Sequence, residues 1–154
     1  MFRDLRRTDR RMENSSAEAI LQDGDYGVMS CMGDNGYGYG VALNYVYYDN
    51  AIYFHCAYDG HKIDAIKNNC KVSFLVVNKS LVIPDELRTR YESVIAFGKA
   101  SQLDGQEKAD ALYKIGDKYS KGFEEIVRKE IESIFTGTCV VKIQIEHKEG
   151  KFAE

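Results

Sequence analysis

The sequence predicts a mainly β domain with flanking helices, in which six antiparallel strands form a barrel. Six segments are rich in valine, isoleucine, tyrosine and phenylalanine. The first three follow one another through short turns, which favours antiparallel pairing. Helices alternate with strands too irregularly for a doubly wound parallel sheet. The length of 154 residues suits a single domain, 1–154, with a basic arm at 1–14 and a helical segment at 104–135.

The strands are predicted from apolar alternation and from the turn residues between them. Asn35 and Gly36 suit the positive φ angles of a hairpin turn, and Asp49 and Asn50 mark the next turn. These turns predict a three-stranded meander at the start of the fold. A loop with the only proline is expected at 78–90. The predicted strands are 26–32, 39–48, 51–57, 71–77, 92–103 and 138–147.

Helices are predicted where apolar residues recur every three or four positions. The first begins at Ser15, whose spacing to Glu18 is that of a capping box, and ends before Gly24. Asp104 and Glu107 have the same spacing at the start of a later helix. The predicted helices are 15–23, 60–69, 104–119 and 123–135.

The composition excludes several classes of protein. A net charge of −3 gives no basic surface for nucleic acid. No apolar run is long enough to cross a membrane, and the first residues lack the apolar core of a signal peptide. The four cysteines contain no C-x-x-C pair, which is typical of reduced thiols and not of a zinc knuckle or a disulfide scaffold. We therefore expect a cytoplasmic protein.

The segment GHKIDAIKNN, residues 60–69, predicts an anion site at the start of a helix. The first amides of a helix lack intrahelical partners, and the helix dipole adds about half a positive charge there. Lys62 supplies a full charge and His61 a further donor, so a phosphate is the expected ligand. A solvent-facing helix end with no ligand is the alternative.

Other candidate sites are weaker. The three histidines have no acidic partners at the spacing of a metal site, so no metal is expected, and His147 is expected to be solvated. A Cys56 nucleophile next to His55 is an alternative that strand geometry disfavours, because neighbours in a strand point to opposite faces. The tyrosines suit barrel packing or the walls of a site for a flat ring. An aromatic wall beside an anion site suggests a cofactor with a ring and a phosphate.

The order of these segments resembles a known family. The series FHCA, GHK, KVSF and RYESVIAFGKA, between Phe54 and Ala100, is similar to the pyridoxamine 5′-phosphate oxidase-like split-barrel flavoproteins, and most closely to their nitroimidazole-resistance branch. The resemblance extends from about Tyr26 to Leu103, and more loosely to His147. It implies a six-stranded split barrel that forms a homodimer and binds FMN at the subunit interface.

The resemblance also implies which residues hold the cofactor. The strand around Gly40 would lie along the isoalloxazine ring, His55 and Cys56 would border the ring and the ribityl chain, and the helix start would bind the phosphate. The implied cofactor-binding residues are Gly40, Val41, Ala42, Leu43, Asn44, Tyr45, His55, Cys56, His61, Lys62 and Ser93.

One departure from the family bears on the phosphate. The oxidase branch has an arginine where this chain has Gly40, so one cation is missing. The arginines of the segment RRTDRR, residues 6–11, which include Arg7, or Arg88 and Arg90 are expected to replace it. The substrate-binding segment of the oxidase has no match after His147, which argues against vitamin B6 oxidation.

These implications lead to an expected function. The chain is expected to be an FMN-dependent oxidoreductase that reduces nitroimidazole-like or other small acceptors, with a nicotinamide as electron donor. His55 is the expected catalytic residue, which would orient or protonate the acceptor. The alternatives are a non-catalytic flavin or haem binding and storage module on the same barrel, and a deazaflavin-dependent reductase.

Overall fold

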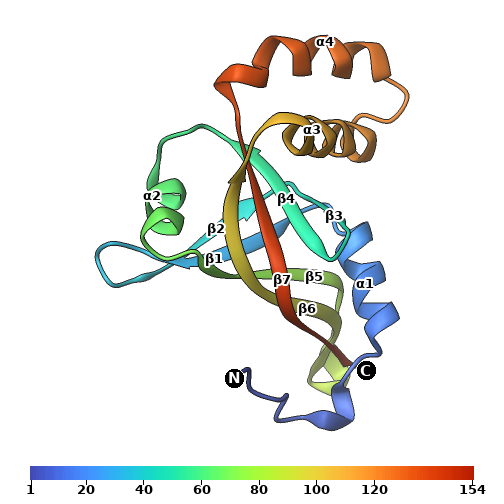
Figure 1. The fold of residues 1–154 in the computed structure, drawn as a ribbon. Coiled ribbons are helices and arrows are strands. Elements are labelled where there is room, and N and C mark those ends of the chain that lie inside the picture. The colour runs from blue at the N-terminus through green and yellow to red at the C-terminus, as the bar shows by residue number, and fades with distance from the viewer.

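The computed structural model describes residues 1–154, with one seven-stranded antiparallel sheet that curves around a core (Figure 1). Four α-helices flank the sheet. The helices are α1 (Asn14–Asp23), α2 (His61–Asn68), α3 (Gly105–Tyr119) and α4 (Glu124–Ile134), with short 3-10 turns at Thr8–Arg10, Pro84–Glu86 and Phe135–Gly137. The strands are β1 (Gly27–Met32), β2 (Gly38–Leu43), β3 (Val46–Tyr48), β4 (Ala51–Cys56), β5 (Lys71–Ile83), β6 (Arg88–Leu103) and β7 (Cys139–Ala153).

The sheet has seven strands where six were predicted, because the predicted strand 39–48 is divided. Its first part, β2, pairs with β1, and its second part, β3, pairs with β4. The strand order is β2-β1-β5-β6-β7-β4-β3, so these two parts form the opposite edges of the sheet. Only Asn44 and Tyr45 join them. The edges of the sheet are therefore linked through the chain, and the predicted barrel is present as a split barrel.

Two other sequence predictions about the strands are wrong. The predicted meander is two hairpins, because β2 and β4 do not pair. The predicted loop at 78–90 is mostly strand: β5 continues to Ile83, and β6 begins at Arg88. The 3-10 turn at Pro84–Glu86 joins the two strands, and Leu87 has φ +52°. Pro84 lies in this turn, where it removes no hydrogen bond from the sheet.

The helix predictions hold in position but not in every cap. The N-cap of α1 is Glu13, which makes no side-chain capping bond, so the predicted Ser15 and Glu18 capping box is absent. Asp104 does cap α3, but its carboxylate accepts from the Gly105 amide and not from the third helical residue. Packing of the helices against the sheet, and not capping, is therefore the main source of their stability.

The side chains form two cores. The larger lies inside the curved sheet and includes Met29, Phe54 and Phe74, all fully buried. The smaller lies between the β3–β4 end of the sheet and the pair α3 and α4, and it includes Tyr53, Leu112 and Ile131. In Figure 1, α3 and α4 cover one end of the barrel, while α2 lies beside the β1–β2 hairpin.

The long strands β6 and β7 curve at one irregular position. Their register shifts between Phe97 and Gly98. A Cβ at Gly98 would lie 2.2 Å from the carbonyl oxygen of Gln144, so only glycine permits this approach. The bulge bends the long β6–β7 pair, which extends to the end of the barrel that α3 and α4 cover (Figure 1).

Candidate functional site

Three of the predicted cofactor residues share one face of the sheet. Residues that pair directly in an antiparallel sheet point to the same side. Gly40 pairs with Ser30, and Ala42 pairs with Val28, on β1. Through Ser73 and Leu75 of β5, these rows continue to Phe97 and Ile95 of β6. Ser93 lies two residues before Ile95 on the same strand. Gly40, Ala42 and Ser93 therefore all lie on the outer sheet face, which comprises Val28, Ser30, Gly40, Ala42, Ser73, Leu75, Val77, Ser93, Ile95 and Phe97.

The outer sheet face is apolar although it points away from the core. Val77 is 55% exposed and Ile95 is 40% exposed. Leu75 pairs with Ile95 on one side and with Val28 on the other, and both Leu75 and Val28 are only partly covered. An apolar sheet face of this kind is typical of a surface that binds a ligand or another protein.

The strand β2 offers backbone groups to a ligand. It is an edge strand, so one of its sides has no strand partner. A Cβ at Gly38 would meet nothing within 4 Å, so a flat group could approach the backbone there. The side chains of Val41 and Leu43 point the other way and pack against the core.

Tyr45 has no free group to offer a ligand. Its side chain is fully buried, and its hydroxyl donates to the Leu21 carbonyl at 2.6 Å. Its N–H donates to the Tyr119 hydroxyl at 3.0 Å, and its carbonyl accepts from Lys118 Nζ at 3.0 Å. We therefore omit Tyr45 from the site proposed below.

The start of α2 presents an unpaired cation. Gly60 has φ +125°, a backbone conformation that favours glycine, and the helix begins at the next residue. The His61 ring stacks on Tyr39 of β2, with ring centroids 4.0 Å apart. Lys62 takes part in none of the ion pairs of the structure. The stacked ring links α2 to β2 through Tyr39, which pairs with Cys31 and therefore lies on the opposite sheet face from Gly40 and Ala42.

His55 and Asn44 lie at a different place, at a cavity under the helices. His55 pairs with Val140 and faces α3 and α4. The cavity has a volume of about 310 Å³, and Asn44 and His55 both line it. Desolvation lowers the pKa of His55 below its usual 6.5, so the imidazole is neutral at neutral pH.

Cys56 faces the barrel interior beside Cys139, its direct partner on β7. Burial raises the pKa of Cys56 to about 11 and also raises the pKa of Cys139. Both thiols are protonated at neutral pH, which does not suit the alternative of a cysteine nucleophile. All four cysteines are free thiols.

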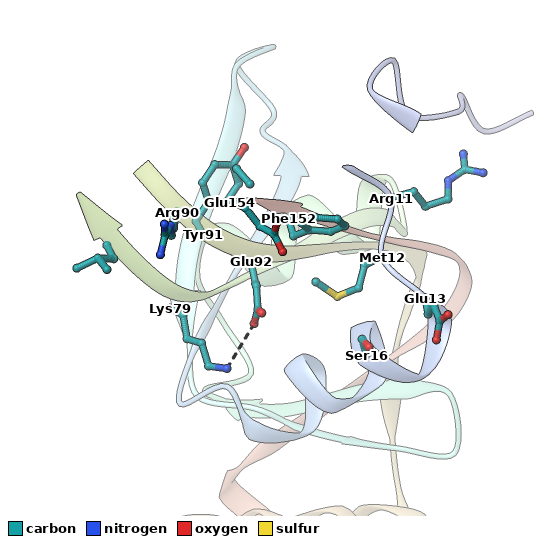
Figure 2. A pocket seen from close by; sticks show the side chains of 12 residues that line it. Arg11, Met12, Glu13, Ser16, Lys79, Arg90, Tyr91, Glu92, Phe152 and Glu154 are labelled. Carbon is teal, nitrogen blue, oxygen red and sulfur yellow. Dashed lines mark ion pairs between the residues drawn. The ribbon is translucent and has the colours of Figure 1, made fainter. Parts of the chain in front are cut away.

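The arginines expected to replace the missing cation lie away from α2 within one chain. Arg7 is paired with Asp9 at 2.6 Å, and Arg88 is paired with Glu86. Arg90 lines a cavity of about 550 Å³ at the far end of the β5–β6 hairpin, where Figure 2 shows it with Lys79 and the Lys79–Glu92 ion pair of 4.0 Å. This cavity contains none of the other predicted site residues.

His147 is only partly solvated, contrary to the prediction, since 30% of its side chain is exposed. Its ring stacks on Phe2 with centroids 4.8 Å apart, and its Nε2 atom is buried without a hydrogen-bond partner. The basic arm therefore reaches the outer sheet face through an apolar side chain. No helix is long and apolar enough to span a membrane.

Comparison with known proteins identifies the family. A family model described as pyridoxamine 5′-phosphate oxidase matches residues 13–152. The chain belongs to this family. No curated protein matches the chain.

Solved structures share the fold of this pyridoxamine 5′-phosphate oxidase family member. One is a candidate 5-nitroimidazole antibiotic resistance protein from Bacteroides thetaiotaomicron, with 22% identity, a TM-score of 0.76, and coverage of 92% of this chain and 86% of that one. Another is an FAD and haem binding protein from Mycobacterium smegmatis, with 14% identity, a TM-score of 0.82, and coverage of 94% and 74%. A third is a haem storage protein from Vibrio cholerae, with 12% identity, a TM-score of 0.66, and coverage of 90% and 94%.

Sequence reasoning missed two residues that shape this family member's site. Lys118 donates to the carbonyls of Gly24 and Tyr45, at 2.6 and 3.0 Å, and the Tyr119 hydroxyl donates to the Asp25 carbonyl at 2.5 Å. These bonds hold the end of α3 against the break between β2 and β3. The helical pattern places Tyr119 on an apolar face, but no local signal indicates which backbone groups its hydroxyl reaches.

Proposed function

We propose that this protein is a cytoplasmic FMN-dependent oxidoreductase that reduces small acceptors, such as nitroimidazole-like compounds, with a nicotinamide as electron donor. Two chains would enclose the cofactor between their outer sheet faces. Family membership supports this proposal, as do the flavin-binding and nitroimidazole-resistance descriptions of proteins with the same fold. The four free thiols suit a reducing compartment.

The observation that carries the proposal is the common face of the cofactor residues. Gly40, Ala42 and Ser93 come from strands far apart in sequence, yet they lie on one apolar face. The exposed Val77 and Ile95 beside them would cover a flat ring and exclude water. An edge strand with free amide and carbonyl groups would bond the polar edge of such a ring, from Gly40 to Asn44.

The start of α2 would hold the phosphate. Lys62 has no carboxylate partner, and the first amides of α2 are free, because the Gly60 N-cap has no side chain that could accept from them. His61 is fixed against Tyr39 and can donate a further hydrogen bond. Cys56 borders this region from the barrel interior.

The protein residues would position the reactants while the cofactor carries the electrons. When bound, FMN supplies two-electron transfer between a nicotinamide and an acceptor. His55 is neutral at neutral pH, so it can donate or accept one hydrogen bond to orient an acceptor. We propose His55 as the catalytic residue in this sense.

The cofactor is tested first by colour and by mass. The purified protein is expected to be yellow and to release a molecule with the mass of FMN on denaturation. The phosphate site is tested by comparing FMN with riboflavin, which lacks the phosphate. Lys62→Ala should weaken FMN binding by about tenfold or more, since one charge-assisted bond is lost, and should leave riboflavin binding unchanged.

The matched control is Lys67→Ala, in the last turn of the same helix. This variant should change FMN affinity by less than about twofold, because Lys67 lies at the opposite end of α2 from the proposed phosphate site. The favourable effect of the helix dipole on a phosphate is confined to the first turn. A colourless protein that does not bind added FMN would count against the proposal. Equal losses of FMN and riboflavin affinity in Lys62→Ala would remove the phosphate site from it.

A storage module is the second candidate function, favoured by the haem-binding descriptions of proteins with this fold. Steady-state oxidation of NADH or NADPH with an added acceptor separates the two candidates. A bound flavin that never turns over, or a haem absorption spectrum, would favour storage. A released cofactor with the mass of a deazaflavin would favour the deazaflavin reductase.

A further inference from the structure

The cavity under α3 and α4 has the composition of a ligand site. Its walls are mainly apolar and come from both helices, including Leu112 and Ile115 of α3 and Val127 and Ile131 of α4. Its floor carries Asn44, which follows β2, and His55 of β4. A volume of about 310 Å³ is at the lower end of the range of about 300–1,000 Å³ for ligand pockets. The space suits a single or fused ring and not a dinucleotide.

Two polar side chains at this cavity have no partner in the protein. Neither the Asn44 amide nor the His55 imidazole takes part in any side-chain hydrogen bond or ion pair of the structure, whereas Tyr119, in the same wall, has its hydroxyl fully used. Both residues are exposed, so their polar groups are open to water and available to a ligand that enters the cavity. The arrangement is typical of an apolar site with a few orienting polar groups.

The charges around the cavity limit the ligand. No lysine or arginine lines it, and the only charged residue in its wall is Glu130 of α4. An anionic ligand would meet this carboxylate and find no cation. Because His55 is neutral at neutral pH, the floor adds no charge either.

We infer that this cavity binds a small uncharged ring compound with a hydrogen-bonding heteroatom, held by Asn44 and His55 beneath the α3–α4 pair. Asn44 directly follows β2, the strand along which the cofactor is proposed to lie, so a bound ring would be next to that cofactor. The assignment of this ring compound as the acceptor rests on the proposed function, but its binding does not.

The test uses the cofactor-free full chain and three probes of similar size. Benzimidazole is uncharged at pH 8, benzoate is an anion and benzylammonium is a cation. Dissociation constants are measured from chemical-shift changes in NMR spectra. Benzimidazole is expected to bind at least about tenfold more tightly than either ion, because the mainly apolar walls desolvate a charge. Benzoate would find no cation, and for benzylammonium an ion pair with the exposed Glu130 would offset little of this cost.

Two variants fill the cavity and one removes its polar group. Ser120→Phe and Ile126→Trp add volume at wall positions, and each is expected to weaken benzimidazole binding by about tenfold or more. His55→Leu should weaken it by about threefold to tenfold, the range for one hydrogen bond. Ser133→Phe is the matched control, since Ser133 lies on α4 but does not line the cavity, and it should leave the affinity unchanged.

The outcomes separate this inference from the proposed function. Unchanged benzimidazole affinity in both filling variants, or equal affinity for benzoate, would overturn the inference. Benzimidazole binding by a protein that takes no flavin would leave the inference standing and overturn the proposed function. FMN binding together with unchanged benzimidazole affinity in both filling variants would overturn the inference and leave the proposed function standing.

Discussion

Cys56 shows how the barrel changes the chemistry of a single side chain. Its thiol lies next to Cys139 on the neighbouring strand, and burial raises its pKa from 9.0 to about 11. In the unfolded chain the thiol loses its proton above about pH 9, while in the folded chain it keeps the proton until about pH 11. The unfolded state therefore binds fewer protons in this window, and stability falls as the pH rises through it.

This linkage predicts a measurable effect at alkaline pH. The urea midpoint of the wild-type protein should fall between about pH 9 and pH 11, and the fall should be shallower in Cys56→Ala. Buried tyrosines with raised pKa values, such as Tyr45 and Tyr119, add to the decrease above pH 10 in both proteins. The exposed Cys70 provides the control, because Cys70→Ala should retain the wild-type slope. Parallel slopes in wild type and Cys56→Ala would refute the assignment.

His55 gives the opposite sign on the acid side. Its folded pKa lies below the usual 6.5, so the unfolded chain takes up a proton first as the pH falls. Stability should therefore decrease as the pH drops from about 6.5 toward the folded pKa. The titration of His55 in NMR spectra is expected to have a midpoint below 6.5, and His55→Leu should remove its share of the acid-side loss. A midpoint at or above 6.5 would contradict the neutral imidazole on which the ligand argument depends.

At the scale of elements, the end of α3 stabilises the break between β2 and β3. A strand that changes partners leaves backbone groups without a sheet partner, and an unpaired buried group is costly. The Tyr119 hydroxyl accepts from the Tyr45 N–H, and Lys118 donates to the Tyr45 carbonyl. The helix pair is thus fixed to the junction that also positions Asn44 and the cavity beneath.

This arrangement predicts a stability difference between two tyrosines of one helix. Tyr119→Phe leaves the Tyr45 N–H unpaired and should lower the free energy of unfolding by about 1–3 kcal/mol. Tyr113→Phe, on the exposed side of α3, should change it by less than about 0.5 kcal/mol. Urea denaturation followed by circular dichroism measures both values. Equal effects of the two substitutions would show that the hydroxyl bonds at the junction contribute nothing.

Local patterns predict the elements well and their partners less well. The turn at Asp49 and Asn50 has the positive φ angles that its residue types favour, and Gly24 ends α1 as expected. The strand 39–48 reads as continuous because tyrosine, valine and leucine dominate it, although Asn44, a residue type depleted in strands, lies at the division. Its division depends on Tyr119 and Lys118, more than seventy residues away, which no local pattern encodes. The same holds for β5 and β6. Their pairing continues as far as Ile83 and Arg88, so the expected loop at 78–90 is a hairpin.

The site was predicted in the same uneven way. The family resemblance implied Gly40, Ala42 and Ser93 as ring residues and Lys62 as a phosphate residue, and the register of four strands explains why the first three share a face. Neither the apolar walls around His55 nor the loss of Tyr45 to internal bonds could be foreseen, because both arise from how α3 and α4 pack on the sheet end.

At the scale of the whole molecule, the outer sheet face is the surface that the proposed dimer would bury. Ile95 lies on this face and is 40% exposed, and it pairs with Leu75 of β5 and with Glu149 of β7. A lysine there would place a charge in an apolar contact, which is strongly unfavourable. Ile95→Lys should therefore convert the protein from a dimer of about 35 kDa, twice the chain mass of 17.5 kDa, to a monomer.

Light scattering during size-exclusion chromatography measures this change. Phe123→Lys is the control, since Phe123 is 60% exposed in the α3–α4 connection and away from the outer sheet face. This variant should remain dimeric. A dimeric Ile95→Lys protein, or a monomeric wild type, would remove the outer sheet face from the account of assembly.

The two-residue link between β2 and β3 has a consequence for chain connectivity. The first and last residues lie at the same end of the molecule in Figure 1, where the backbone of Arg11 also forms an antiparallel β-bridge with Lys151. If a short linker joined those termini and the backbone were opened between Asn44 and Tyr45, every strand would keep its neighbours. The permuted protein would begin and end at opposite edges of the sheet, and no peptide bond would hold those two edges together.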